Sequence, residues 1–259
     1  MKSIFKLIRA TEHIFRDALT VPEKLEAAFN FVSLIEGYDA ERLRGHHYTL
    51  AMVGKTFFNY GYYENLVPLL KRGRIPPKYF YERAGLSVLN TLGLYYRQKG
   101  DRDSSDYYFR AMLESADSVK FRGVYDAVAM TNIARNSMAR RDYPKAIMLL
   151  QKALPVKIGD NDLAFAAEIC IALAESYLEA GKLQQTKDMI DSAQIFIDLR
   201  NAYRHYVDLY PLKSKYYAKI GDVKASWAYM DSTIVLQQEY REIGDGYRFF
   251  RYVYQASRA

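Results

Sequence analysis

The chain has 259 residues, half of them apolar, so it is long enough to bury a substantial core in one large domain or two smaller ones. The net charge is +7, and a charged fraction of 26% with only 7 prolines and 14 glycines argues against a disordered or collagen-like chain. A single cysteine excludes an internal disulfide bond. No run of about 18 apolar residues occurs, which excludes a membrane-spanning helix and favours a soluble, cytoplasmic protein unless a leader or an anchor has been removed.

The first predicted element is an amphipathic helix over 4–19, in which charges interrupt the apolar residues too often for a signal peptide. Beyond it, short polar or glycine-bearing turns recur at nearly equal intervals. Five of these turns lie at Gly61, Gly100, Arg141, Gly181 and Gly221. Their separation, a repeat length of about 40 residues, is in the range typical of repeat architectures. A sixth turn precedes Pro22, a residue suited to the first position of a helix. Six turns predict six pairs of antiparallel helices.

Each pair carries small residues where its two helices are expected to cross. Matching positions on the first helices hold Gly54, Gly93, Ala134 and Ala174. A glycine inside a helix costs about 1 kcal/mol relative to alanine, so close packing has to account for the glycines. On one second helix, Tyr143, Ala146, Leu150 and Ala153 share a face, since they lie three or four residues apart. This stripe predicts a face against which neighbouring helices dock.

The recurring pattern of a large residue, a large-plus-small pair, a tyrosine and a turn resembles the tetratricopeptide repeat (TPR). The resemblance is strongest in LNTLGLYYRQKGDRDSSDYYF and RRDYPKAIMLLQKAL, and it extends from about residue 40 to 243. It implies an all-α, right-handed superhelical solenoid of about six antiparallel helix pairs. Two departures are that each repeat takes about 40 residues instead of about 34, and that Lys213-Ser214 replaces the large-plus-small pair of the sixth repeat. Such long, degenerate repeats resemble those of bacterial sensor and regulator proteins in signalling.

The C-terminal stretch breaks at Gly244 and Gly246 and then places Tyr247, Phe250, Val253 and Tyr254 on one face. We expect a capping helix over 246–259, because the last repeat of a solenoid needs a cover. The expected domains are therefore a repeat array over 1–245 and this cap. The alternative is a self-associating regulatory subunit that uses the C-terminal helix or a tyrosine-rich convex face as its interface, so homo-oligomers are part of the prediction.

The sequence offers no set of residues suited to catalysis. His46 and His47 are adjacent and so point in different directions on a helix, and no phosphate-binding loop, cysteine pair or calcium loop occurs. In DRDSSD (101–106) the acids are expected to cap a helix, and Cys170 is expected to be a buried thiol. We therefore predict a protein that is not an enzyme and has neither a cofactor nor a metal.

Binding is the predicted function, because the first helices of a TPR superhelix line an extended concave groove. The repeat register places ten polar residues on that inner side: Lys55, Asn59, Asn90, Arg97, Thr131, Asn132, Arg135, Glu168, Glu175 and Lys215. The groove is expected to be basic in its N-terminal half and acidic near the fifth repeat, which suits a protein or peptide segment of mixed charge. The prediction is a scaffold or sensor module with a protein or peptide ligand of unknown identity.

Two narrower ligand classes are disfavoured. Chaperone-tail binding needs a lysine and asparagine clamp, but Ala51 and Thr91 occupy clamp positions and Glu168 would repel a carboxylate. RNA-reading repeats need one recurring side-chain type at a fixed position, whereas that position here varies among Lys55, Leu94 and Glu175. Nucleic acid is therefore not an expected partner.

Overall fold

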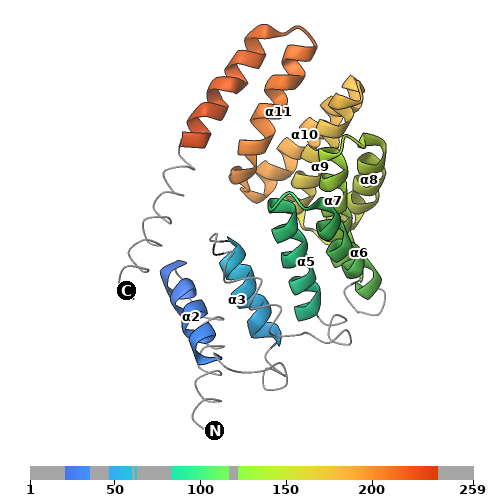
Figure 1. The fold of residues 1–259 in the computed structure, drawn as a ribbon. Helices are drawn as coiled ribbons and strands as arrows, with labels where there is room; N and C mark the ends of the chain where they lie inside the picture. The colour runs from blue at the N-terminus through green and yellow to red at the C-terminus, as the bar shows by residue number, and fades with distance from the viewer. Residues whose placement is uncertain (1–20, 36–46, 60–61, 63–82, 117–121, 239–259) are drawn as a thin grey trace. The chain divides into compact units, whose positions relative to one another are not determined.

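The computed structural model describes residues 21–35, 47–59, 62, 83–116 and 122–238 (Figure 1). Within these ranges every regular element is a helix, which confirms the all-α prediction. The chain divides into two compact units, Met1–Tyr125 and Asp126–Ala259. None of the described helices is long and apolar enough to cross a membrane. The expected helix over 4–19, the turn at Gly61 and the cap over 246–259 lie outside the described residues.

The N-terminal compact unit contains four described helices, each in contact with the next along the chain. They are α2 (Val21–Leu34), α3 (His47–Asn59), α5 (Arg83–Gln98) and α6 (Arg102–Ala116). Phe31, Phe57 and Phe109 are fully buried between them. The helices α5 and α6 cross at Gly93, where a Cβ atom would lie 2.5 Å from Phe109 Cε1. Close packing of two helices thus explains this mid-helix glycine, as the sequence predicted.

The C-terminal compact unit holds most of α7 (Arg122–Ala139) and the helices that follow it. These are α8 (Tyr143–Gly159), α9 (Leu163–Glu179), α10 (Leu183–Arg200), the 3-10 turn η2 (Tyr203–His205) and α11 (Tyr206–Lys219), followed by a helical segment over 223–238. Helices α7, α9 and α11 are the first helices of the fourth, fifth and sixth repeats. The second helices are α8, α10 and the segment 223–238, and successive helices run antiparallel (Figure 1).

Two apolar clusters join these helices into a continuous stack. One joins α7, α8 and α9, and the other joins α9, α10 and α11. Ala146, Leu150 and Ala153 of α8 are completely buried in the first cluster, so three of the four residues of the expected docking stripe pack there, whereas Tyr143 is half-buried. Helix α9 contributes to both clusters, because its two sides face the preceding and the following pair.

The connections in this unit share one backbone conformation, and it recurs at equal intervals along the chain. Left-handed φ values occur at Arg141, Asn161, Gly181, Asn201 and Gly221, with angles of 62°, 57°, 73°, 50° and 85°. In each case the amide of the residue after the left-handed one donates to a carbonyl in the last turn of the preceding helix, as Asp142 does to Ser137. This Schellman turn ends a helix sharply. The connections within and between repeats are therefore of the same type, and each repeat consists of two helices that take equal lengths of chain.

Aspartates that follow the left-handed residue begin most of the next helices. The side chains of Asp101, Asp142, Asp162 and Asp222 each accept a hydrogen bond from the amide three residues on, at 3.0 to 3.3 Å. The capping role expected for an acid in DRDSSD is thus held by Asp101. Lys182 occupies the same position before α10 and makes no side-chain cap.

Ser214 explains how the sixth repeat tolerates a departure from the repeat pattern. It is buried, and its carbonyl accepts a hydrogen bond of 3.0 Å from the hydroxyl of Ser226. The same arrangement joins Gly93 and Ser105 in the third repeat, at 2.8 Å. A serine can therefore stand at the small position, because a hydroxyl on the second helix meets the first helix there.

Candidate binding pocket

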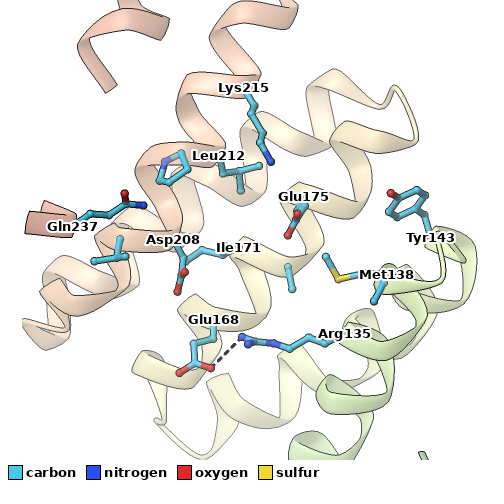
Figure 2. Close-up of a pocket in the computed structure, with 14 residues that line it drawn as sticks. Arg135, Met138, Tyr143, Glu168, Ile171, Glu175, Asp208, Leu212, Lys215 and Gln237 are labelled. Atoms are coloured by element: carbon cyan, nitrogen blue, oxygen red, sulfur yellow. Dashed lines mark hydrogen bonds and ion pairs between the residues drawn. The ribbon is translucent and has the colours of Figure 1, made fainter. Parts of the chain in front are cut away.

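An open pocket of about 610 Å³ lies in the C-terminal compact unit, between the first helices of three successive repeats (Figure 2). Helices α7, α9 and α11 supply most of its lining, and Gln237 comes from the segment 223–238. Its lining residues are Arg135, Met138, Ala139, Tyr143, Glu168, Ile171, Ala172, Glu175, Val207, Asp208, Pro211, Leu212, Lys215 and Gln237. Four of these, Arg135, Glu168, Glu175 and Lys215, belong to the ten residues predicted from the sequence.

Positions that are one repeat length apart in the chain line equivalent parts of this pocket. Arg135, Glu175 and Lys215 occupy one such position, and Glu168 and Asp208 occupy another. Residues at a fixed repeat offset share a direction because α7, α9 and α11 are stacked copies of one element. The pocket is therefore the common inner side of three first helices, and charge alternates along it.

Glu168 is the centre of the ionic contacts at one end of the pocket. Its carboxylate lies 3.2 Å from the Arg135 guanidinium, 3.6 Å from Arg204 and 3.8 Å from His205 Nε2. Arg135 and Glu168 were predicted as separate ligand-binding charges, but in the structure they pair with each other (Figure 2). Each therefore offers only part of its hydrogen-bonding capacity to a ligand.

His205 is a buried imidazole at the edge of this cluster, with 4% of its surface exposed. Burial lowers the pKa of His205, and the positive charges of Arg204 and Arg135 lower it further, against the opposing effect of Glu168 and Asp208. The imidazole is therefore neutral at pH 7, and the cluster at Glu168 depends on the two arginines for its positive charge.

The other charged groups of the pocket are more available. Glu175 is half-buried, whereas Asp208 and Lys215 are exposed, and within the described part of the chain none of the three forms an ion pair. Glu175 and Lys215 project from facing helices into the same space (Figure 2). A ligand could therefore pair with charges of both signs a short distance apart.

An apolar surface separates the charged ends. Ile171 and Ala172 of α9 and Leu212 of α11 are largely buried, and Met138 of α7 adds a flexible thioether. Aliphatic side chains flanked by a few polar groups are typical of a pocket that binds part of a peptide, because the apolar area contributes binding energy and the polar groups orient the ligand.

The remaining predicted residues do not line this pocket. Thr131 and Asn132 of α7 are buried, and the Thr131 hydroxyl donates to the Ala127 carbonyl at 2.7 Å. Asn90 and Arg97 lie half-buried on α5 in the other compact unit, and each interacts with other residues of the chain. Lys55 and Asn59 lie on α3, and their side chains are outside the described part of the structure.

Sequence analysis missed several lining residues, including Asp208, Leu212 and Gln237. Asp208 could have been predicted, because it stands one repeat length after Glu168. Leu212 gave no distinct signal, because an apolar residue on a first helix is usually part of the core. Gln237 lies on a second helix, and the prediction considered only residues of the first helices.

The one cysteine of the chain is not part of this pocket. Cys170 is completely buried, and burial raises the pKa of its thiol to about 12, so it remains protonated and unreactive. Within the described ranges no cluster of three or more histidine, cysteine, aspartate or glutamate side chains is arranged to hold a metal ion.

Comparison with solved structures identifies the fold. BtubC (BKLC) from P. vanneervenii is 13% identical to this chain, with a TM-score of 0.59 over 90% of this chain and 92% of that one. Two structures from Podosopora anserina, described as a putative kinesin light chain with nearly identical TPR-like repeats, are 13% and 12% identical. Their TM-scores are 0.55 and 0.53, and each match covers 78% of this chain and 98% of theirs.

No family model matches the sequence, and no curated protein matches it. The structural matches nevertheless agree with the residue pattern and the paired helices. The chain has a TPR-like helical-repeat fold, as the resemblance in the sequence implied.

Proposed function

We propose that the protein is a non-enzymatic scaffold or sensor module that binds a protein or peptide segment in the pocket formed by α7, α9 and α11. The observation that carries the proposal is the composition of that pocket: equivalent positions of three repeats supply Arg135, Glu175 and Lys215 around an apolar surface. Binding by a TPR-like protein on the side lined by its first helices is a known use of helical repeats.

The side chains specify what kind of segment would bind. An apolar ligand side chain would rest on Ile171 and Leu212, a basic one would pair with Glu175 or Asp208, and an acidic one with Lys215. The preferred ligand therefore has an apolar residue flanked by charges of both signs. This refines the mixed-charge ligand expected from the sequence, and the four predicted residues of the N-terminal compact unit remain a prediction for a longer ligand.

Selection of peptides from a displayed random library, with the full chain as target, tests the proposal. We expect selected peptides to carry that mixed-charge pattern. Glu175→Lys and Lys215→Glu should each weaken binding of a selected peptide roughly tenfold or more, because each change replaces attraction by repulsion. Lys152→Glu is the matched control, since Lys152 is exposed on α8, outside the pocket.

Titration of labelled peptide against each purified variant gives the affinities. Equal affinity of the chain and of both pocket variants for every selected peptide would reject this pocket as the binding site. Arg97→Glu in the same assay tests the N-terminal part of the predicted groove, where a loss of affinity would show that the ligand extends beyond the pocket.

A further inference from the structure

A buried histidine lies next to the pocket without lining it. His205, the last residue of η2, is almost fully buried, and its Nε2 atom lies 3.8 Å from the carboxylate of Glu168, a pocket residue. The preceding residue, Arg204, does not line the pocket either. A titratable side chain so close to the charges of the pocket can make their arrangement depend on pH.

The contacts of Glu168 are divided between its two carboxylate oxygens. Oε2 accepts a hydrogen bond of 3.2 Å from Arg135 Nη2 (Figure 2). Oε1 lies 3.6 Å from Arg204 Nη2 and 3.8 Å from His205 Nε2. Arg204 Nε also donates to His205 Nε2 at 3.4 Å, so this nitrogen is an acceptor and the imidazole is neutral in this arrangement. The position of Arg204 therefore depends on an unprotonated Nε2 atom.

Protonation of His205 changes the partners of Arg204. A protonated imidazole has a donor on each nitrogen, so Nε2 no longer accepts from Arg204 and instead donates to Glu168 Oε1. The positive charge on the ring also repels the Arg204 guanidinium. Because 70% of the Arg204 side chain is exposed, it can turn toward water, whereas Arg135 retains the other oxygen, Oε2.

The charged groups that face His205 come from four elements. Burial lowers the pKa of His205 below its usual value of about 6.5. Two carboxylates oppose this shift, those of Glu168 on α9 and Asp208 on α11. Two guanidinium groups add to it, those of Arg204 on η2 and Arg135 on α7. The acids balance the arginines when the imidazole is neutral, so protonation, below about pH 6.5, leaves one positive charge in excess.

We propose that His205 and Arg204 determine which ligand charge this end of the pocket accepts. When the imidazole is neutral, Glu168 and Asp208 attract a basic ligand group. When the imidazole is protonated, it takes Glu168 Oε1, Arg204 is released, and the excess positive charge attracts an acidic ligand group. The effect on ligands rests on the proposed function, whereas the exchange of partners at Glu168 does not.

NMR of the full chain without any ligand tests the exchange directly. The imidazole signals of His205, one of four histidines, are assigned by their loss in His205→Gln, and the Arg204 Nε–H signal by its loss in Arg204→Gln. As the pH falls from about 7 to about 5, the Arg204 signal should shift with the same midpoint as the His205 signals. An Arg204 signal that does not follow His205, in a sample that circular dichroism shows to be folded, would overturn the proposal.

Selection from the displayed peptide library at two pH values tests the effect on ligands. Peptides selected at about pH 5.5 should carry more acidic residues than those selected at about pH 7.5. A peptide from the higher-pH selection that lacks histidine should bind roughly fivefold more weakly at the lower pH. With His205→Gln as the target both differences should disappear, because glutamine does not titrate. Equal differences with this variant would overturn the proposal.

Arg204→Gln tests the released arginine at an exposed position, where the substitution leaves the fold intact. This variant should lose affinity for the acidic peptides at low pH, whereas Lys152→Gln, which removes an exposed charge outside the pocket, should retain it. Equal affinities of the two variants would contradict a role of Arg204. If the library yields no peptide at either pH, the proposed function is overturned, and the NMR titration still supports or overturns the exchange.

Discussion

At the scale of single residues, Gly93 of α5 packs directly against the Phe109 ring of α6. A Cβ atom at position 93 would lie 2.5 to 2.9 Å from three atoms of the Phe109 ring, and that ring is completely buried. The ring has no room to retreat, so the distance between these two helices depends on the absence of a side chain.

Gly93→Ala should therefore lower the free energy of unfolding by about 1–2 kcal/mol, because the cost of overpacking exceeds the gain of about 1 kcal/mol in helix propensity. Gly159→Ala is a control at a helix glycine with no atom within 4 Å of the added Cβ, and it should be neutral or stabilising. Urea denaturation measures both. Addition of Phe109→Leu to Gly93→Ala should recover part of the loss, and no recovery would refute the steric cause.

His205 makes stability depend on pH. Its pKa is lowered in the folded chain, chiefly by burial, while Arg204 and Arg135 oppose and Glu168 and Asp208 favour its protonated form. A group whose pKa falls on folding stabilises the fold above its unfolded pKa of about 6.5, and this contribution is lost as the pH falls below that value.

The free energy of unfolding should decrease between pH 6.5 and pH 5, by up to about 1.4 kcal/mol per pH unit from this group. His205→Gln should flatten that part of the profile, since glutamine does not titrate. Urea denaturation at closely spaced pH values measures the slope. If the variant and the original chain have the same slope, other groups are responsible.

At the scale of elements, the turns between helices determine where each helix begins. Asp162 is the best example, because one carboxylate has two roles. It accepts a hydrogen bond from the Phe165 amide at the start of α9 and pairs with Lys157 of α8 at 3.2 Å. The Lys157 side chain is only 2% exposed, so its charge has little contact with water.

Asp162→Ala should cost about 2–3 kcal/mol, because it removes a helix cap and also leaves a buried ammonium group without its partner. Asp142→Ala removes a cap of the same geometry without an ion pair and should cost about 1 kcal/mol. Chemical denaturation of both variants measures the difference. Equal losses would show that the Lys157 pair contributes nothing.

The elements also show what the sequence could reveal. The repeat period and the stripe of Ala146, Leu150 and Ala153 could be predicted from the sequence, because helical spacing and small residues directly indicate packed faces. The shorter period, half a repeat and made of one helix with its turn, could not be predicted from the sequence. The reason is that Asn161 and Asn201 form the left-handed turns where no glycine marks them. Asparagine adopts the left-handed conformation but is also common elsewhere, so it gives a weaker signal.

Prediction of the pocket residues was less complete for a related reason. The repeat register identified the direction of Arg135, Glu175 and Lys215 from α7, α9 and α11. It did not identify that Arg135 and Glu168 pair with each other, or that Thr131 is buried with its hydroxyl bound to the Ala127 carbonyl. These features depend on the distance between neighbouring helices, which a register alone does not define.

At the scale of the whole molecule, each compact unit derives its stability from contacts between neighbouring helices. Helix α9 is the most enclosed element of the C-terminal unit, since 11 of its 17 residues are buried and it belongs to both apolar clusters. In the segment 223–238 only Thr233 is buried, with 6% of its surface exposed, whereas Val223, Trp227 and Ile234 are each more than half exposed.

Hydrogen exchange should therefore be slowest in α9 and faster in the segment 223–238. The last helix can open without disturbing its predecessors, whereas opening of α9 disrupts both clusters. Mass spectrometry of exchanged peptides from the full chain measures this order. Protection of 223–238 equal to that of α9 would mean that the unit opens only as a whole.

The left-handed turns also determine how the repeat array can be lengthened by duplication. These turns lie at Arg141, Asn161, Gly181, Asn201 and Gly221. Duplication of residues 143–182 would insert one helix pair between two identical kinds of connection, so every later side chain would keep its direction and the array would lengthen by one repeat. Duplication of a single helix with its turn would instead exchange inner and outer faces in everything that follows. Recombination can therefore extend this array only by whole helix pairs, and each added pair brings another row of side chains to the inner side.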